Sequence, residues 1–182
     1  SIIVHEVQNG FFSKRLITTN TNFLLSAIDY FSAKLFPAVI LLLDPEKAFD
    51  LINWEVLFAI LRKSNFPFQL ICLISKLCIG AEARIVIHFV EIFKVSIERG
   101  RRHWYPLSQI LFSLFIEPLF CALLQSLDVR PPVVGAPKIK LFADDITLYL
   151  AADELNVSSA ISTINQFSAI GGYRINQSKT EV

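Results

Sequence analysis

Two adjacent aspartates between two strand-like runs constrain the fold of this chain most strongly. Residues 138–141 and 146–150 have the patterns of short strands, and Phe-Ala-Asp-Asp lies between them, ending in Asp144 and Asp145. A tight hairpin turn favours Asn-Gly or Asp-Gly because it requires positive φ, and neighbouring carboxylates repel each other. A divalent cation such as Mg²⁺ relieves that repulsion, since it takes carboxylate oxygens as ligands. The alternative is an ordinary solvated turn, where Asp-Asp also occurs.

A second predicted strand also ends in an aspartate. Residues 38–43 form a continuous apolar run, which is typical of a strand buried on both faces, and Asp44 follows directly. If this strand neighbours the Asp144–Asp145 hairpin in one sheet, three carboxylates meet at one edge. That arrangement suits two metal ions that clamp the attacking and leaving oxygens of a phosphoryl transfer. The spacing alone does not establish that the strands are adjacent.

The rest of the chain alternates predicted helices with short strands. Apolar periodicity and capping residues predict helices at 18–34, 53–63, 68–78 and 157–170, and a long apolar helix that begins at Ser108 and kinks or breaks near Pro118. Residues 84–90 and 92–97 are predicted to form a hairpin, and residues 173–175 lead into a final strand. This order predicts an α+β fold, with helices on one face of an antiparallel sheet.

The composition raises the question of a membrane protein, because 53% of the residues are hydrophobic and the mean hydropathy is +0.52. Charges or prolines interrupt every apolar run before the ~18 residues that a spanning helix needs. The longest run, 107–127, contains Glu117-Pro118. We therefore expect one globular domain that does not bind membranes. Because the chain has no Met and no secretory signal, we also expect it to begin inside a longer reading frame.

Cysteine, histidine and charge narrow the chemistry further. The cysteines are odd in number and lie in apolar stretches, which predicts buried, reduced thiols in an intracellular protein: Cys72, Cys78 and Cys121. The three histidines are scattered, which argues against a zinc site. A net charge of +1 is small for a nucleic-acid binder. Residues 99–102 nevertheless form a local basic cluster, whose alternative interpretation is a solvated turn.

Five segments, in this order along the chain, resemble the motifs of reverse transcriptases from non-LTR, LINE-type retrotransposons. They are residues 8–11 with Arg15 (fingers), 43–50 with Trp54 (first catalytic motif), 100–112 with 117–119 (second palm motif), 142–145 (the most diagnostic motif) and 176–181 (the motif after it). Each segment alone is a weak or moderate match. All five in the right order identify the chain as similar to this family.

The resemblance implies a polymerase right-hand palm, with an antiparallel sheet backed by helices, plus part of the fingers. Residues 1–182 would be a single fragment of a reverse transcriptase domain, with part of the fingers in 1–37 and mainly palm in 38–182. Thumb and endonuclease would be missing parts of the same polyprotein. The family also implies an intracellular protein that acts in the nucleus, although the chain contains no targeting signal. We expect the fragment to aggregate when expressed alone, because a palm buries apolar faces against fingers and thumb.

The resemblance also implies the chemistry. Asp44, Asp144 and Asp145 would be the catalytic carboxylates and bind two Mg²⁺ ions, for which Mn²⁺ can substitute, with the backbone carbonyl of Pro45 assisting. The 3′-hydroxyl of a DNA primer would attack the α-phosphate of a dNTP paired with an RNA template. Catalysis would come mainly from positioning and charge neutralisation.

Substrate contacts follow from the same motifs. Phe49, Arg102 and Lys179 would bind the dNTP, and Phe49 would exclude a 2′-hydroxyl. Arg15 and Trp104 would contact the template. Each has a simpler alternative: a core aromatic for Phe49, a solvated strand lysine for Lys179, and a surface cation for Arg15.

The second motif departs from the family pattern, because Trp104 stands where the family has glycine and Gln109 where it has proline. Glycine there permits close approach of the backbone to the nascent base pair, whereas Trp places a bulky side chain in that space. A second hypothesis is therefore a catalytically dead remnant of a retrotransposon copy. A third is a structural or membrane-associated protein, which only the hydropathy supports. Group II intron and telomerase-type polymerases share the palm, but residues 46–50 fit LINE elements better.

Overall fold

A three-stranded antiparallel sheet lies at the centre of the fold, in the order β1-β5-β4. The computed structural model describes residues 17–46, 52–78, 82–96, 106–142, 145–176 and 180. Strand β1 (Ala38–Leu43) pairs with β5 (Asp145–Ala151), and β5 forms a hairpin with β4 (Ile139–Phe142). The predicted Phe-Ala-Asp-Asp hairpin is therefore present, with Asp145 as the first residue of β5.

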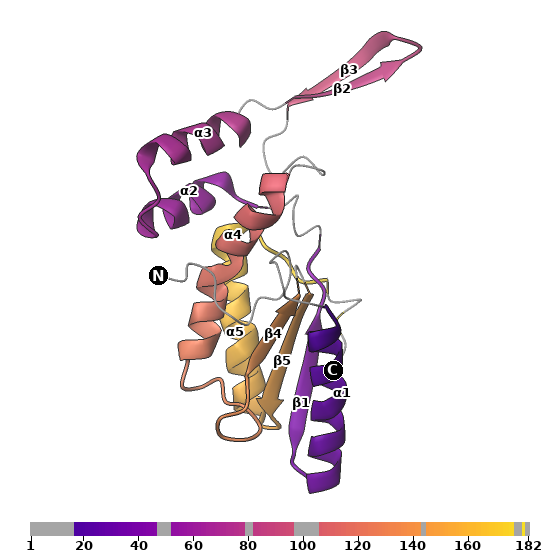
Figure 1. Cartoon of the computed structure of the whole chain (residues 1–182), viewed down its shortest axis with the longest axis vertical. Helices are drawn as coiled ribbons and strands as arrows, with labels where there is room; N and C mark the ends of the chain where they lie inside the picture. The colour runs from indigo at the N-terminus through magenta and orange to yellow at the C-terminus, as the bar shows by residue number, and fades with distance from the viewer. Residues whose placement is uncertain are drawn as a thin grey trace.

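Helices and a second hairpin surround this sheet (Figure 1). They are α1 (Ile17–Lys34), α2 (Trp54–Lys63), α3 (Phe68–Cys78), β2 (Glu82–Ile87), β3 (Val90–Ser96), α4 (Pro106–Gln125) and α5 (Glu154–Gly171). Helices α4 and α5 run together beside the sheet, α1 lies along β1, and the β2–β3 hairpin projects away beyond α3. The architecture is the predicted α+β arrangement of an antiparallel sheet and helices.

One face of the sheet, which we call the core face, is apolar and almost fully buried. Successive strand residues point to opposite faces, and the core face carries Leu41, Leu43, Ile139, Leu141, Ile146, Leu148 and Leu150, none more than 5% exposed. Helix α4 contributes to the same core with its large side chains, each at most 1% exposed: Leu111, Phe112, Phe115, Ile116, Leu119, Phe120 and Leu123. Burying each such side chain contributes about 1.5–3 kcal/mol.

Helix α4 is the one helix in the described part of the chain that is long and apolar enough to cross a membrane. The stretch Leu107–Gln125 meets that criterion by length and composition, but more than half of it is buried inside the fold. Such burial is the pattern of a core helix. Of the predicted kink or break near Pro118, the break is absent, because α4 continues through this proline. The predicted start at Ser108 is also wrong, since the helix begins at Pro106.

Helix α1 covers part of the opposite face of the sheet, which we call the α1 face (Ile40, Leu42, Lys140, Thr147 and Tyr149). The rings of Phe23 and Tyr149 meet edge to face, with centroids 5.1 Å apart. Helices therefore lie on both faces, whereas the sequence predicted one. The prediction that β1 is buried on both faces is also wrong: Ile40 and Leu42 are only half-buried, because α1 covers this face incompletely.

Local capping signals placed several helix ends correctly. The side chain of Asn53 accepts a hydrogen bond from the backbone N–H of Glu55 at 2.9 Å and caps α2 as predicted. Gly172 follows α5 with φ +75°, the left-handed conformation that favours glycine.

The β2–β3 turn lies at His88 and Phe89, both with positive φ, and not at Glu91 as predicted. The cysteines are half-buried, not buried.

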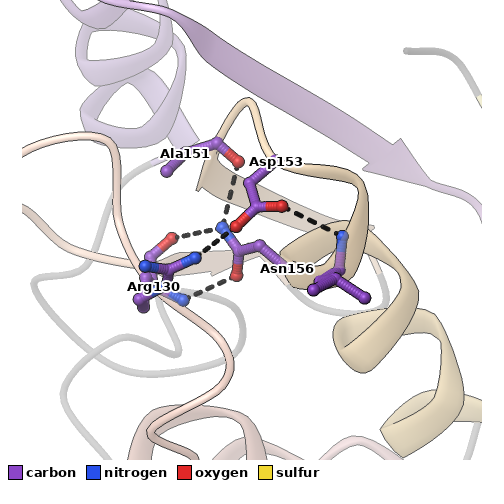
Figure 2. A network of polar contacts seen from close by, with 5 residues as sticks. Arg130, Ala151, Asp153 and Asn156 are labelled. Atoms are coloured by element: carbon purple, nitrogen blue, oxygen red, sulfur yellow. Dashed lines mark hydrogen bonds and ion pairs between the residues drawn. The ribbon is translucent and has the colours of Figure 1, made fainter.

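A polar network joins the loop before β4 to the start of α5 (Figure 2). The side chain of Asn156, which is 1% exposed, accepts a hydrogen bond from the Arg130 N–H at 2.7 Å. It also donates to the backbone carbonyls of Arg130 (2.9 Å) and Ala151 (3.0 Å). The carboxylate of Asp153 accepts from the N–H of Leu155 at 3.1 Å, caps α5 and pairs with the guanidinium of Arg130. This network holds α5 against the end of β5.

We predict that Asn156→Ala lowers the free energy of unfolding by about 2 kcal/mol, because it leaves the Arg130 N–H without its acceptor. It also removes a second hydrogen bond from the Arg130 and Ala151 carbonyls, which otherwise accept only from the backbone N–H groups of Ala151 and Asp153. Urea denaturation followed by circular dichroism measures the change. The matched control is Asn165→Ala on the same helix, since Asn165 is exposed and its replacement should change stability by less than about 0.5 kcal/mol. Equal effects of the two substitutions would contradict the role of the network.

We predict that Tyr149 ionises late and links stability to alkaline pH. Burial raises the pKa of Tyr149 to about 12, whereas an exposed tyrosine has a pKa of about 10. Between these values the unfolded chain releases the proton and the folded chain retains it, so stability falls as the pH rises above about 10. Absorbance at 295 nm should show a late-titrating component in the wild type that Tyr149→Phe reduces by the equivalent of one tyrosine. An unchanged titration curve would contradict this assignment.

Candidate active site

Asp44 and Asp145 lie side by side at one end of the central sheet. Leu43 pairs with Ile146, so the next residues along the two antiparallel strands, Asp44 and Asp145, face each other. Leu43 and Ile146 point into the core, and alternation therefore puts both aspartates on the α1 face. The adjacency of the two strands, which the spacing left open, is confirmed. Asp145 is exposed and Asp44 half-buried, so both carboxylates have access to solvent.

The segment after α5 holds the backbone around Asp44. The N–H of Asn176 donates to the Asp44 carbonyl at 2.8 Å, and the N–H of Glu46 donates to the Arg174 carbonyl at 2.8 Å. Pro45 and Ile175 form an antiparallel bridge between these two bonds, where the sequence predicted the start of a final strand. This pairing places the motif that begins at Asn176 directly beside the first catalytic motif.

Several predicted site residues lie outside the described residues. They are Arg15, Phe49, Arg102, Trp104, Asp144 and Lys179. Among the residues that are described, no group of three or more His, Cys, Asp or Glu side chains is placed to hold a metal ion. The described part of the candidate site is thus the opposed pair Asp44 and Asp145.

Sequence reasoning missed the residues next to this pair on the α1 face. Leu42 pairs with Thr147, and Thr147 pairs with Lys140. This row of three residues lies one two-residue step from the aspartates. The signal was available in the sequence, because Lys140 stands two residues before Phe142, which pairs with Asp145. Hairpin register therefore puts Lys140 on the same face as Asp145.

Comparison with known proteins identifies the family. The sequence profile of the reverse transcriptase (RNA-dependent DNA polymerase) family matches residues 3–182. The chain belongs to this family. It is 29% identical over 182 residues to the transposon TX1 uncharacterized 149 kDa protein of Xenopus laevis. This match covers 98% of the chain and 14% of the Xenopus protein. The resemblance to reverse transcriptases of LINE-type retrotransposons is thereby confirmed.

Solved structures of telomerase share the fold. The telomerase from Candida albicans, solved with a TWJ fragment of telomeric RNA, superimposes with a TM-score of 0.68 at 12% identity and covers 91% of this chain and 30% of its own. An apo telomerase from Candida tropicalis superimposes with a TM-score of 0.65 at 14% identity. That match covers 97% of this chain and 36% of the telomerase chain. The chain therefore has the right-hand polymerase fold that the sequence predicted. The chain spans about a third or less of each of these proteins.

We predict that Asp145→Asn raises the free energy of unfolding by about 0.5 kcal/mol when no divalent cation is present, because like charges directly opposite each other destabilise a sheet. Thermal unfolding in a chelating buffer measures the gain, which should shrink in 1 M NaCl, where the screening length is about 3 Å. Asp128→Asn, which removes an exposed loop charge, is the matched control. A gain equal to that of the control would show that the two aspartates do not repel each other.

Proposed function

We propose that this chain is the RNA-directed DNA polymerase domain of a retrotransposon protein. It adds deoxynucleotides to the 3′-hydroxyl of a DNA primer, with RNA as the template. The main support for the proposal is the register of β1 and β5. It brings Asp44 and Asp145 opposite each other, at one end of the sheet and on the same face. The family match supports the reaction class.

Divalent metal fits this donor set. Asp44 and Asp145 offer hard carboxylate oxygens to a common space, and Asp144 stands next to Asp145 in the sequence. The carbonyl of Pro45 supplies a further oxygen in this proposal, and the preferred ions are two Mg²⁺, with Mn²⁺ as a substitute. When bound, two such ions lower the pKa of the primer hydroxyl and neutralise charge on the transferred phosphate.

The protein itself supplies position. Asp44 directly follows β1 and Asp145 begins β5, so both carboxylates lie at the end of two paired strands whose other face is packed in the core. Side chains on such rigid elements hold a reacting geometry better than side chains on loops. Asp44 and Asp145 therefore fix where the reacting oxygens meet, and positioning of this kind supplies much of the rate enhancement.

The remaining assignments are part of the same proposal. Phe49, Arg102 and Lys179 contact the dNTP, and Arg15 and Trp104 contact the template. Residues 1–37 belong to the fingers and 38–182 mainly to the palm, with thumb and endonuclease in other parts of the same polyprotein. The protein acts inside the cell, in the nucleus, without a membrane.

The test is metal-dependent primer extension on an RNA template. This segment replaces the corresponding segment of a complete, active polymerase of the family. We expect extension that Asp144→Ala and Asp145→Asn each reduce by about 10² or more, because each removes charge stabilisation at the reacting phosphate. Asp128→Asn serves as the control and should leave extension unchanged. Extension that survives both active-site substitutions would reject the assignment of the aspartates.

A second candidate is a catalytically dead remnant, and Trp104 in place of the motif glycine favours it. Trp104→Gly in the same graft separates the two. Silence in the wild-type graft with rescue by Trp104→Gly would mean an intact aspartate site behind a blocked nucleotide pocket. Silence in both would place the damage elsewhere and favour the remnant. Activity in the unmodified graft would rule the remnant out.

A further inference from the structure

We infer that Lys140 is a positioning residue that binds a backbone phosphate of the nucleic acid on the α1 face of the sheet. The inference rests on the proposed function, because it takes Asp44 and Asp145 as the place where the primer ends. It adds a cation beside the two aspartates that the structure describes.

The register places Lys140 close to the aspartates. Phe142 pairs with Asp145 and Lys140 pairs with Thr147, so Lys140 lies diagonally opposite Asp145 on the same face. Two residues along a strand span about 6.8 Å. Lys140 is therefore only one row away from the row that carries the aspartates, so its long side chain can reach a phosphate close to the primer end.

Lys140 lies where the cover of the α1 face by helix α1 ends. Helix α1 covers the next row along the sheet, where Phe23 packs on Tyr149. Thr147 in the row of Lys140 is half-buried and Asp145 beyond it is exposed. Lys140 thus stands at the border between the part of the α1 face that the helix covers and the part that ends in the aspartates.

The positive charge of Lys140 is available to bind a phosphate. Lys138 donates to the carbonyls of Leu124 and Ser126 at 3.0 and 2.8 Å, and Arg130 pairs with Asp153. Across the described residues, by contrast, the Lys140 ammonium has no carboxylate partner. It lies 5.0 Å from the centroid of the Phe23 ring. Lys140 is half-buried, and a cation–π contact contributes about 0.5–1 kcal/mol at an exposed site and about 2 kcal/mol when desolvated. A hydrogen bond between a lysine ammonium and a phosphate joins two opposite charges and is roughly twice as strong as a neutral hydrogen bond, so it competes with this contact.

The first experiment measures binding of a DNA primer annealed to an RNA template by fluorescence anisotropy, over a series of salt concentrations. The proteins are the complete polymerase that carries this segment and the same graft with Lys140→Met or Lys140→Arg, and each is checked for folding by its thermal transition. Removing one phosphate contact should reduce the slope of log Kd against log salt by about one, and Lys140→Arg should retain the slope. Lys76→Met removes an exposed charge on α3 and should not change it. A Lys140→Met slope equal to that of wild type overturns the inference.

The second experiment identifies the strand. Neutral methylphosphonates replace single phosphates near the primer end, first in the primer and then in the template. One substitution should weaken wild-type binding several-fold and leave Lys140→Met binding unchanged, which shows that the lysine and that phosphate act together. If Lys140→Met responds like wild type at every position, the inference is wrong.

Binding and polymerisation are separate readouts. A salt slope that depends on Lys140 in a graft that does not extend primers would support the inference and reject the proposed function. Primer extension by a graft whose salt slope does not depend on Lys140 would support the proposed function and overturn the inference. Failure of the graft with the unmodified segment to bind the duplex would overturn the inference.

Discussion

The pairing of β1 with β5 is the interaction on which the rest of the structure depends. A single register does two things at once: it turns Leu43 and Ile146 into the core, and it turns Asp44 and Asp145 to the opposite face. A slip of one residue would exchange the two faces of a strand. It would expose the buried leucines and drive a carboxylate toward the core, where an unpaired charge is very costly. The apolar core therefore determines where the carboxylates stand.

The two faces of the sheet consequently have different physical tasks. The core face is closed by α4, whose buried aromatic and aliphatic side chains make the strands rigid. The α1 face is closed only at one end, where Phe23 meets Tyr149. The other end of this face carries Asp44 and Asp145, and like charges directly opposite each other lower the stability of a sheet. Such a conflict between local preference and fold is typical of a functional site, and it is tolerable because the opposite face supplies the stabilisation.

Local signals in the sequence predicted the elements well. Asn53 and Gly172 mark helix ends because capping depends on neighbouring residues only, and the Phe-Ala-Asp-Asp hairpin follows from two short runs and the turn between them. The adjacency of Asp44 and Asp145 is different. It depends on pairing between strands about a hundred residues apart, and no local pattern encodes such a contact. Only the family resemblance predicted it.

The errors have equally physical causes. The apolar run of β1 predicted burial on both faces, but burial is set by what packs on a strand, and α1 packs on one part of it. Pro118 was expected to kink or break α4, and the helix continues through the proline because the surrounding core holds it together. His88 and Phe89 were not recognised as a turn because side chains with positive φ are strained. In each case tertiary packing outweighed local preference.

The β2–β3 hairpin shows what the fold is like without such packing. Its side chains Ile85, Ile87, Val90 and Phe93 are each at least half exposed, and its strands pair only with each other. A two-stranded hairpin alone is at best marginally stable in water. The central sheet has a third strand and a buried face, so its local stability is much higher. The candidate site is built on the rigid unit. The weaker hairpin carries part of the exposed apolar surface that underlies the expected aggregation, and further exposed apolar side chains lie on α1 and α3. The stability of the site is thus largely independent of the hairpin.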